Sequence, residues 1–588
     1  MPKIWEPGLG AIDLENGDCR FRVWAPNAER VEVDLDGRRA ALEPTENGYF
    51  EGVVEGAGPG TLYAYRLDGG DARPDPASRF QPGTVHGPSQ VVARRFDWTD
   101  EGWRGLPLDE HILYELHVGT FTPEGTFDAV IPQLDRLVDL GITAVELMPV
   151  AQFPGTRNWG YDGALPFAVQ NSYGGPEGLK RLVDACHARG LAVVLDVVYN
   201  HLGPEGNYLS EFGPYFTERY KTPWGLAINY DGPHSDPVRR YFIENALHWI
   251  AEYHFDGLRL DAVHAIADAS ERPFLQELGT EVKALAEGLG RRVHVFPESD
   301  INTLFFLRPP ERGGCGFDAQ WTDDFHHCLH SLLTGERDGY YRDFGSLAQM
   351  AKAMAGGFVY TGQYSPYRRR RHGVPADEME GSRHVVAIQN HDQTGNRMNG
   401  ERIASLVDFE SRKLAAGAVL LSPFLPLLFM GEEHGETAPF LYFVSHSEPG
   451  LIESVREGRR EEFAAFGWPG EPPDPQSEET FERSRPTARN EELYAFYKEL
   501  IGCRKAEPAL RNLSKADQEV SLFEDLGVIV ARRWSGENEV VIAYNFAEEE
   551  RAVPVPDGDW RKLLDSGCAE IGGEGLRMGR RSVVMLGR

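Results

Sequence analysis

The sequence predicts a (β/α)8 barrel with an all-β sandwich at each end of the chain. Three observations lead to this prediction. Strand-like and helix-like runs alternate from about residue 110, eight strand candidates can be counted, and both chain ends consist of short strands and turns. We expect a sandwich over 1–97, a barrel over 98–505 with an inserted subdomain near 199–237, and a second sandwich over 506–588.

The N-terminal region has the pattern of a small sandwich. Four short apolar runs are separated by Gly, Asn and Asp-Gly turns, which are typical of hairpins. The predicted strands are Cys19–Trp24, Val31–Leu35, Tyr49–Val54 and Leu62–Leu67. The next segment, Asp68–Ser89, is rich in Gly, Pro and Asp, so we expect it to cross to the barrel.

The central region supplies the eight barrel strands. Apolar residues recur at helical spacing from Phe127 to Val138 until Gly141, and a second helix opens at Pro176 and stops at Gly190. Strands that alternate with helices in this way pair in parallel. The predicted strands are Ile112–Val118, Ala144–Met148, Ala192–Val198, Phe255–Leu260, Val293–Pro297, Phe317–Trp321, Val385–Gln389 and Pro426–Met430.

Two long connections and the C-terminal region complete the predicted architecture. The connections Tyr199–Pro237 and Gly356–Arg383 exceed ordinary loop length and are candidates for lids over a site. The second contains four consecutive arginines, Arg368–Arg371, which either clamp a ligand or form a solvated loop face. After a helix near Glu491–Arg504, short strands such as Val540–Phe546 predict the second sandwich.

Composition narrows the classes of partner. The 588 residues include 60 basic and 91 acidic side chains, a formal charge of −31, which disfavours nucleic acid and anionic membranes and favours a neutral substrate. The simpler explanation is that the acidity merely keeps the protein soluble. Six scattered cysteines lack metal-binding spacing, and no signal peptide or apolar span of membrane length is present. We expect a cytoplasmic monomer or weak dimer without metal or cofactor.

Polar and ionisable residues follow many of the predicted strands. In a barrel of this kind the carboxyl ends of the strands form one common mouth, so these side chains should converge there. They are His117 after the first strand, Asp196, Asn200 and His201 at the third, Arg259, Asp261 and His264 at the fourth, Glu298 at the fifth, Asp323 and Asp324 at the sixth, and His391 and Asp392 at the seventh.

This set of carboxylates suits glycoside hydrolysis. The sequence contains no zinc-type His/Cys cluster, no Walker loop, no strand-linked G-x-G-x-x-G and no G-x-S-x-G elbow. Asp261 lies two residues after Arg259, which should keep it ionised as a nucleophile, whereas Glu298 follows an apolar run that should keep it protonated as an acid. Their placement on adjacent strands fits the short gap of a retaining enzyme, but an inverting gap stays open.

Four motifs resemble the conserved regions of the α-amylase family of glycoside hydrolases. They are DVVYNH (Asp196–His201), GLRLDAVH (Gly257–His264), the segment around Glu298, and NHDQTGN (Asn390–Asn396). The resemblance implies Asp261 as nucleophile, Glu298 as proton donor and Asp392 as transition-state stabiliser. It also implies that substrate is bound by Tyr161, Asp196, Asn200, His201, Arg259, His264, His391, Gln393, Thr394, Gly395 and Asn396.

Further segments resemble one branch of that family. FRVWAPNAERVEV (Phe21–Val33) is similar to the sandwich module of branching enzymes, isoamylases and trehalohydrolases. The segments Arg73–Val91, Phe317–His327 and Phe429–His446 look like those of trehalohydrolases, which cut the α-1,4 bond next to the terminal trehalose of maltooligosyl trehalose. This implies that the trehalose side of the cleft is contacted by Asp323, Asp324, Phe325, His326 and His327.

Some features leave other functions open. A branching enzyme, which transfers the glycosyl unit to another chain, would share the same three carboxylates. A glucan-binding scaffold without activity would not need all three intact. The Phe-Pro pair before Glu298 departs from the small residue that is commoner in the family, which puts the local backbone there in question. Asn200 occupies a position where some amylases bind calcium.

Overall fold

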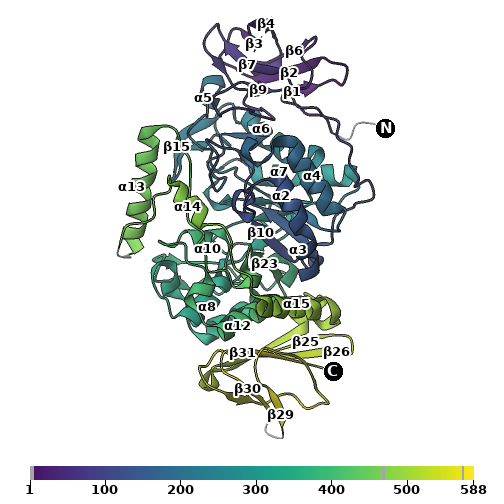
Figure 1. Ribbon diagram of the computed structural model, residues 1–588, viewed down its shortest axis with the longest axis vertical. Helices are drawn as coiled ribbons and strands as arrows, with labels where there is room; N and C mark the ends of the chain where they lie inside the picture. The colour runs from purple at the N-terminus through teal and green to yellow at the C-terminus, as the bar shows by residue number, and fades with distance from the viewer. Residues whose placement is uncertain (1–4, 467–469, 573–574) are drawn as a thin grey trace.

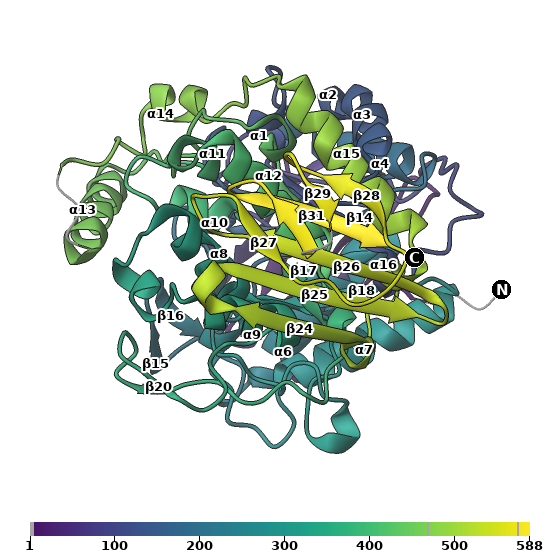
Figure 2. The ribbon, with the colours of Figure 1, turned by 90° about the horizontal axis from the view of Figure 1, so that it is seen from below.

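The computed structural model describes residues 5–466, 470–572 and 575–588. Three parts are stacked along the long axis of the molecule, with the N-terminal sheets at one end, the barrel in the middle and the C-terminal sheets at the other end (Figure 1). Seen from the C-terminal end, the C-terminal sheets lie in front of the middle of the barrel (Figure 2). The predicted division at 97/98 and 505/506 stays a prediction; the second boundary falls in the last turn of helix α15 (Glu491–Ala506).

The N-terminal part is a sandwich of two antiparallel sheets. The four strands predicted there have the predicted bounds. The sheets pack through rings such as Phe21 and Tyr63, whose centroids lie 5.0 Å apart. One sheet has the order β1 (Gly10–Asp13), β2 (Cys19–Trp24), β6 (Tyr49–Val54), β5 (Glu43–Pro44). The other consists of β4 (Arg38–Ala41), β3 (Val31–Leu35), β7 (Leu62–Leu67) and β8 (Ala72–Arg73), with β9 (Ser89–Gln90) paired to β7.

Eight parallel strands form the barrel. In chain order they are β10 (Leu113–Leu116), β11 (Ala144–Leu147), β14 (Ala192–Val197), β17 (Gly257–Leu260), β18 (His294–Pro297), β19 (Gln320–Trp321), β22 (His384–Val386) and β23 (Leu425–Phe429). Each pairs with its chain neighbour except β18 and β19, which are the two ends of the hydrogen-bonded order, and β23 returns to β10. Between β18 and β19 the barrel is closed by Asp318, whose N–H donates to the Val295 carbonyl at 3.0 Å and whose carboxylate accepts from the Val295 N–H at 2.8 Å.

Helices cover the outside of the barrel where the apolar spacing predicts them. In α3 (Leu134–Leu140), Leu134, Leu137 and Leu140 are buried, and Gly141 ends the helix with φ of 101°. The other barrel helices are α1 (Val118–Phe121), α2 (Phe127–Val130), α4 (Gly175–His187), α6 (Ser235–Glu252), α7 (Phe274–Leu289), α8 (Asp323–Thr334), α9 (Leu347–Gly356), α10 (His391–Gly395), α11 (Ile403–Leu406) and α12 (Phe409–Leu420). Among the described helices none is long and apolar enough to cross a membrane.

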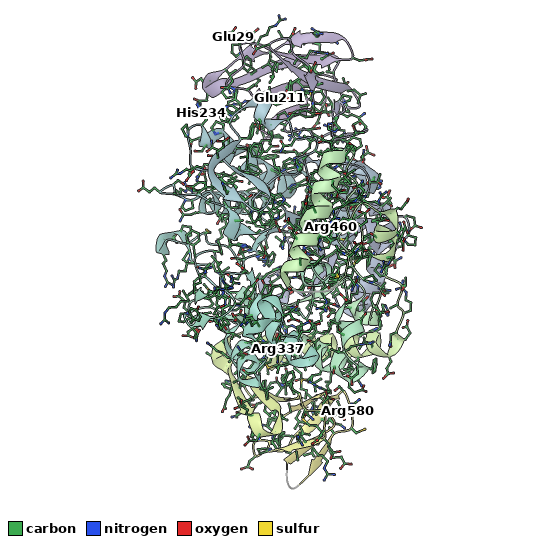
Figure 3. All side chains as sticks on the ribbon, turned by 90° about the vertical axis from the view of Figure 1, so that its left-hand side faces the viewer. Glu29, Glu211, His234, Arg337, Arg460 and Arg580 are labelled. Atoms are coloured by element: carbon green, nitrogen blue, oxygen red, sulfur yellow. The ribbon has the colours of Figure 1, made fainter. Side chains whose placement is uncertain are left out.

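Several connections between the barrel strands contain further helices and hairpins. The long connection 199–237 contains α5 (Leu209–Phe212) and the hairpin β15 (Phe216–Thr222)–β16 (Gly225–Ile228). A second small hairpin joins β12 (Ala151–Gln152) to β13 (Leu165–Val169), and a third, β20 (Tyr364–Ser365)–β21 (Arg370–Arg371), includes part of the arginine run. Helix α13 (Pro449–Phe466), which bears Arg460, runs along one side of the molecule (Figure 3), followed by α14 (Glu478–Arg483).

The C-terminal part is again all-β, as predicted. It follows α16 (Pro508–Arg511) and packs on α12, where a Cβ added to Gly417 would come within 2.7 Å of the Val583 side chain. The larger sheet has the order β24 (Gln518–Phe523), β25 (Val528–Ser535), β26 (Asn538–Asn545), β31 (Ser582–Gly587), β28 (Arg561–Asp565). The smaller sheet has the order β27 (Arg551–Val553), β30 (Gly575–Met578), β29 (Glu570–Gly572).

Candidate active site

Asp261 and Glu298 stand at equivalent ends of neighbouring strands. Strands β17 and β18 are parallel, with Leu260 opposite Pro297, so the residue after each strand reaches the same rim. The Asp261 N–H donates to the Val197 carbonyl at 3.0 Å, and the Glu298 N–H donates to the Leu260 carbonyl at 2.9 Å. These bonds continue the sheet by one residue, so rigid backbone holds both carboxyl groups, as the adjacent placement in the sequence predicts.

One buried guanidinium organises the carboxyl groups of the rim. Nη1 of Arg259 donates to both oxygens of Asp196, at 2.9 and 2.8 Å, and to Oδ1 of Asp261 at 2.8 Å. Its Nη2 lies 3.8 Å from Oε2 of Glu298 and 3.9 Å from Oδ2 of Asp392. Carboxyl groups from four separate places in the chain therefore surround a single positive charge, which is itself stacked 4.4 Å from the Trp321 ring.

The environment shifts the pKa values of Asp261 and Glu298 in opposite directions. Burial alone would raise the pKa of Asp261, but the charge of Arg259 and the amide of Asn200 more than offset it, so the pKa lies below 3.8. Burial raises the pKa of Glu298 above 4.5, and the negative charge of Asp261 adds to that shift. Two neighbouring carboxyl groups with pKa values shifted apart, one down and one up, are what a nucleophile and a general acid require.

Asp392 is the most open of these carboxyl groups, with 41% of its side chain exposed. Its Oδ1 accepts from Nδ2 of Asn396 at 3.3 Å and lies 3.5 Å from Nε2 of His391. Nε2 of His391 also lies 2.7 Å from the hydroxyl of Tyr161, whose ring stacks on the imidazole at 5.2 Å. The partly exposed Tyr161 ring thus rests on the fully buried His391 ring beside an exposed carboxylate, an arrangement that suits a sugar ring and its hydroxyl groups.

Asn200 holds Asp261 by hydrogen bonds, and His201 in turn holds Asn200. Nδ2 of Asn200 donates to Oδ2 of Asp261 at 2.7 Å and to its carbonyl at 2.9 Å, while its Oδ1 lies 2.5 Å from Nδ1 of His201. The other ring nitrogen of His201 bonds the Tyr161 carbonyl at 3.0 Å. The two polar ends of the Asn200 amide are therefore engaged inside the protein.

His264 lies on the outer part of the rim, with its Nε2 3.8 Å from Oδ1 of Asp300. Arg368, the first residue of the arginine run, donates to Oδ2 of Asp300 at 2.9 Å and to its carbonyl at 3.0 Å. The other three arginines of the run are exposed. One member of the run therefore ties the Gly356–Arg383 connection to the rim, and the rest form a solvated face.

The segment Asp323–His327 faces mostly inward, and the contact of these five residues with substrate stays a prediction. Oδ2 of Asp324 accepts from the Asn302 side chain and from two backbone N–H groups, those of Val359 and Tyr360, at 2.7 to 2.9 Å. Phe325 is fully buried, and His326 bonds the Ile388 carbonyl. These contacts arise because α8 begins at Asp323, so the following residues turn onto the barrel.

Asp323 itself keeps some exposed surface, and its Oδ1 accepts from Nε2 of Gln393 at 3.3 Å. Two other predicted binding residues, which lie in α10 after Gln393, are buried. Thr394 is 1% exposed, and a Cβ at Gly395 would come within 2.0 Å of the Trp159 ring. Both residues therefore pack inside the protein, and their contact with substrate stays a prediction. His327 is buried too, against the ring of Tyr340 at 4.7 Å.

Sequence reasoning missed Glu115, in the middle of β10. Its Oε1 contacts Nδ1 of His391 and its Oε2 accepts from the His391 N–H at 3.0 Å. Arg459 of α13 was also missed; it donates to the Gly395 carbonyl at 3.0 Å and to Oδ1 of Asn396 at 3.2 Å. A glutamate inside an apolar barrel strand was the available signal for the first. Nothing local in the sequence announces the second, since α13 folds back from a distant segment.

Within the described ranges, no group of three or more His, Cys, Asp or Glu side chains is arranged to hold a metal ion.

Family models match three stretches of the chain. Residues 90–224 match the α-amylase catalytic domain, residues 8–81 match carbohydrate-binding module 48 (the isoamylase N-terminal domain), and residues 516–585 match a domain of unknown function, DUF3459. These stretches fall on the first barrel units, the N-terminal sandwich and the C-terminal sheets, respectively.

Relatives and solved structures cover almost the whole chain. The chain is 48% identical to malto-oligosyltrehalose trehalohydrolase of Saccharolobus solfataricus over 84% of this chain and 86% of the relative. It is 40% identical to that of Deinococcus radiodurans over 98% and 96%. A Salmonella typhimurium structure described as a candidate α-amylase superposes with a TM-score of 0.91 at 38% identity, covering 99% and 100%. The chain therefore belongs to the malto-oligosyltrehalose trehalohydrolases, within the α-amylase family of glycoside hydrolases.

Proposed function

We propose that the protein hydrolyses the α-1,4-glucosidic bond next to the terminal trehalose of maltooligosyl trehalose, with retention of configuration, and releases trehalose. One observation carries the chemistry: Asp261 and Glu298 share the Arg259 guanidinium but have pKa values shifted in opposite directions. The choice of substrate is supported by the names of the relatives that match almost end to end. This activity would place the protein in trehalose biosynthesis.

The first step forms a glycosyl-enzyme. A carboxylate oxygen of Asp261 attacks the anomeric carbon while protonated Glu298 gives its proton to the glycosidic oxygen, so the C–O bond breaks and trehalose leaves as a neutral alcohol. Asp392, exposed beside His391, would bind hydroxyl groups of the ring as it flattens. Arg259 keeps Asp261 ionised until the attack and then stabilises the carboxyl groups that remain.

The second step returns the enzyme to its starting state. Glu298, now a carboxylate, takes a proton from water, and the oxygen of that water attacks the same carbon and displaces Asp261. Two inversions at one carbon give a glucan whose new reducing end is in the α configuration. In a branching enzyme a glucan hydroxyl would replace this water, so the two functions differ in the acceptor and not in the three carboxyl groups.

The remaining expectations are proposals as well. We propose that the enzyme works in the cytoplasm as a monomer or weak dimer, without a resident metal or cofactor. Its described cysteines are unpaired, and four of them are buried (Cys19, Cys186, Cys315 and Cys328), as expected of thiols that pack as small apolar groups in a reducing compartment.

Product analysis tests this proposal. Purified protein is incubated with maltotriosyltrehalose and, in parallel, with maltopentaose, and the products are separated by chromatography. We expect fast release of trehalose and maltotriose from the first substrate and slow cleavage of the second. Equal cleavage of both would contradict the proposed specificity, and longer or branched glucans would favour a transferase.

A further inference from the structure

We propose that Glu115 is a positioning residue that fixes His391 as a doubly protonated imidazolium, pointed at Tyr161 and Asp392. This inference rests on the proposed function, because its consequence is a property of the sugar site. Glu115 lies in the interior of β10, with both oxygens directed at one histidine: Oε1 contacts Nδ1, and Oε2 accepts from the backbone N–H at 3.0 Å.

The hydrogen bonds around the ring require two N–H groups. While Asp196 is ionised, the Tyr161 hydroxyl donates to its Oδ2 at 2.5 Å, and the hydroxyl oxygen then accepts from Nε2 of His391, 2.7 Å away. On the other side of the ring, the Glu115 carboxylate can only accept from Nδ1. A neutral imidazole carries a single N–H. Both contacts are therefore satisfied at once only when His391 is a cation.

The charges that face the ring favour the same state. His391 is fully buried, which disfavours a cation, but the negative charges of Asp392 and Glu115 prevail over burial and over Arg259, and the pKa of His391 is raised to about 9. The groups that face it from the surrounding elements are Glu115 on β10, Glu146 on β11, Asp196 after the middle of β14, Arg259 on β17, Asp392 on α10, Tyr161 in the loop between β12 and β13, and His117 after β10.

This arrangement connects a strand buried in the barrel to the open carboxylate. The imidazolium lies 3.5 Å from Oδ1 of Asp392 and supports the Tyr161 ring on one face. Through its second oxygen, Glu115 also holds the peptide N–H at the start of α10, one residue before Asp392. Removing the negative charge of Glu115 would lower the pKa of His391, so the ring would lose one N–H within the working pH range.

Glu146 provides a matched control. It lies directly opposite Glu115 on the adjacent strand and is equally buried, at 1% exposed. Both of its carboxyl oxygens are without a hydrogen-bond partner in the part of the chain that the structure describes. Burial, with the charge of Glu115 added, raises its pKa well above the ordinary range, so glutamine, an amide of the same shape, is the substitution that disturbs its charge least.

The first experiment measures the protonation of His391 without reference to activity. Protein labelled at histidine Cε1 with carbon-13 is titrated by NMR, and the His391 signal is identified by its loss in His391→Asn. We expect the wild-type signal to stay at the imidazolium position until well above pH 7, and to titrate at least about one pH unit lower in Glu115→Gln. A wild-type His391 that titrates near the ordinary value of 6.5 would overturn the inference.

The second experiment measures kcat and KM on maltotriosyltrehalose from about pH 5 to about pH 10. In Glu115→Gln the alkaline limb of kcat should move down by about one unit, whereas Glu146→Gln leaves it in place and Glu115→Asp restores it in part. An equal shift in Glu146→Gln, or none in Glu115→Gln, would refute the role of Glu115. If the wild type released no trehalose at all, the proposed function would fail, and the NMR titration would still decide the state of His391.

Discussion

Two clusters of buried charge lie at opposite ends of the same barrel, and they are built differently. At the carboxyl ends of the strands, Arg259 faces four carboxyl groups and its Nη2 makes no hydrogen bond within the described chain. At the amino ends, His187 lies between Asp100 at 2.7 Å and Asp256 at 2.9 Å, and Arg291 donates to the latter at 2.9 Å.

In the cluster at the amino ends of the strands, which we call the lower cluster, the positive and negative groups are matched. Each oxygen of Asp256 has two donors: Arg291 and Trp103 for one, His187 and the Val193 N–H for the other. The cluster around Arg259 at the carboxyl ends, which we call the upper cluster, has more carboxyl groups than positive charges. Burial disfavours so many negative charges, so the pKa values of its carboxyl groups move apart. That of Asp196 is raised to about 7, mainly by burial, while that of Asp261 is lowered. We infer that the imbalance serves the reaction and the balance serves stability.

The largest expected effect on turnover comes from substitutions in the upper cluster. Asp261→Asn and Glu298→Gln remove the nucleophile and the acid without changing their shapes, so each should reduce kcat by several orders of magnitude, as loss of a catalytic group usually does. Thermal unfolding of both variants should stay close to that of the wild type, because neither carboxyl group is part of a balanced pair. Turnover near the wild-type rate in either variant would refute the assignment.

A smaller effect separates two neighbouring aspartates. Asp323 is partly exposed at the rim, whereas Asp324 holds the Val359–Tyr360 backbone and Asn302. We therefore expect Asp323→Asn to raise KM for maltotriosyltrehalose, about tenfold if one sugar hydrogen bond is lost, with little change in unfolding temperature. Asp324→Asn should lower the unfolding temperature and reduce turnover of capped and plain glucans alike. A selective loss of the capped substrate in Asp324→Asn would restore its predicted sugar contact.

The smallest effect on activity comes from the lower cluster. Although burial acts against it, Asp100 and Asp256 raise the pKa of His187, so its stabilising contribution is complete below pH 6.5 and is lost as the pH rises through the higher folded value. The pKa values of Asp100 and Asp256 are lowered, so their contribution is lost in acid. His187→Asn should therefore lower the apparent unfolding midpoint more at about pH 6 than at about pH 9, leaving kcat at low temperature unchanged. An equal loss at both pH values would contradict this account.

The same contrast explains how much could be predicted from sequence. The ends of parallel strands share one rim by topology, so Asp261, Glu298 and Asp392 could be brought together from the order of the strands alone. Glu115 could not, because its partner His391 lies 276 residues away and only the closure of β23 onto β10 brings them into contact.

The orientation of a side chain could not be predicted from a motif alone. A motif such as Asp323–His327 fixes the position of a segment at the rim, but helical geometry turns each successive residue by about 100°, so a continuous run cannot face a cleft throughout. Asp324, Phe325 and His326 consequently point inward. The strand predicted over Val385–Gln389 ends at Val386, and the Gln389 side chain beyond it bonds Glu432 and the Ile403 N–H.

The most direct test of the central claim is the configuration of the newly formed reducing end. Proton NMR follows the anomeric signals during the first minutes of maltotriosyltrehalose cleavage, before mutarotation equilibrates them. A double displacement through Asp261, with Glu298 as acid and then base, predicts that the maltotriose appears first as the α-anomer. If the β-anomer appeared first, the reaction would proceed by a single inversion, and the assignment of Asp261 as a covalent nucleophile would be wrong.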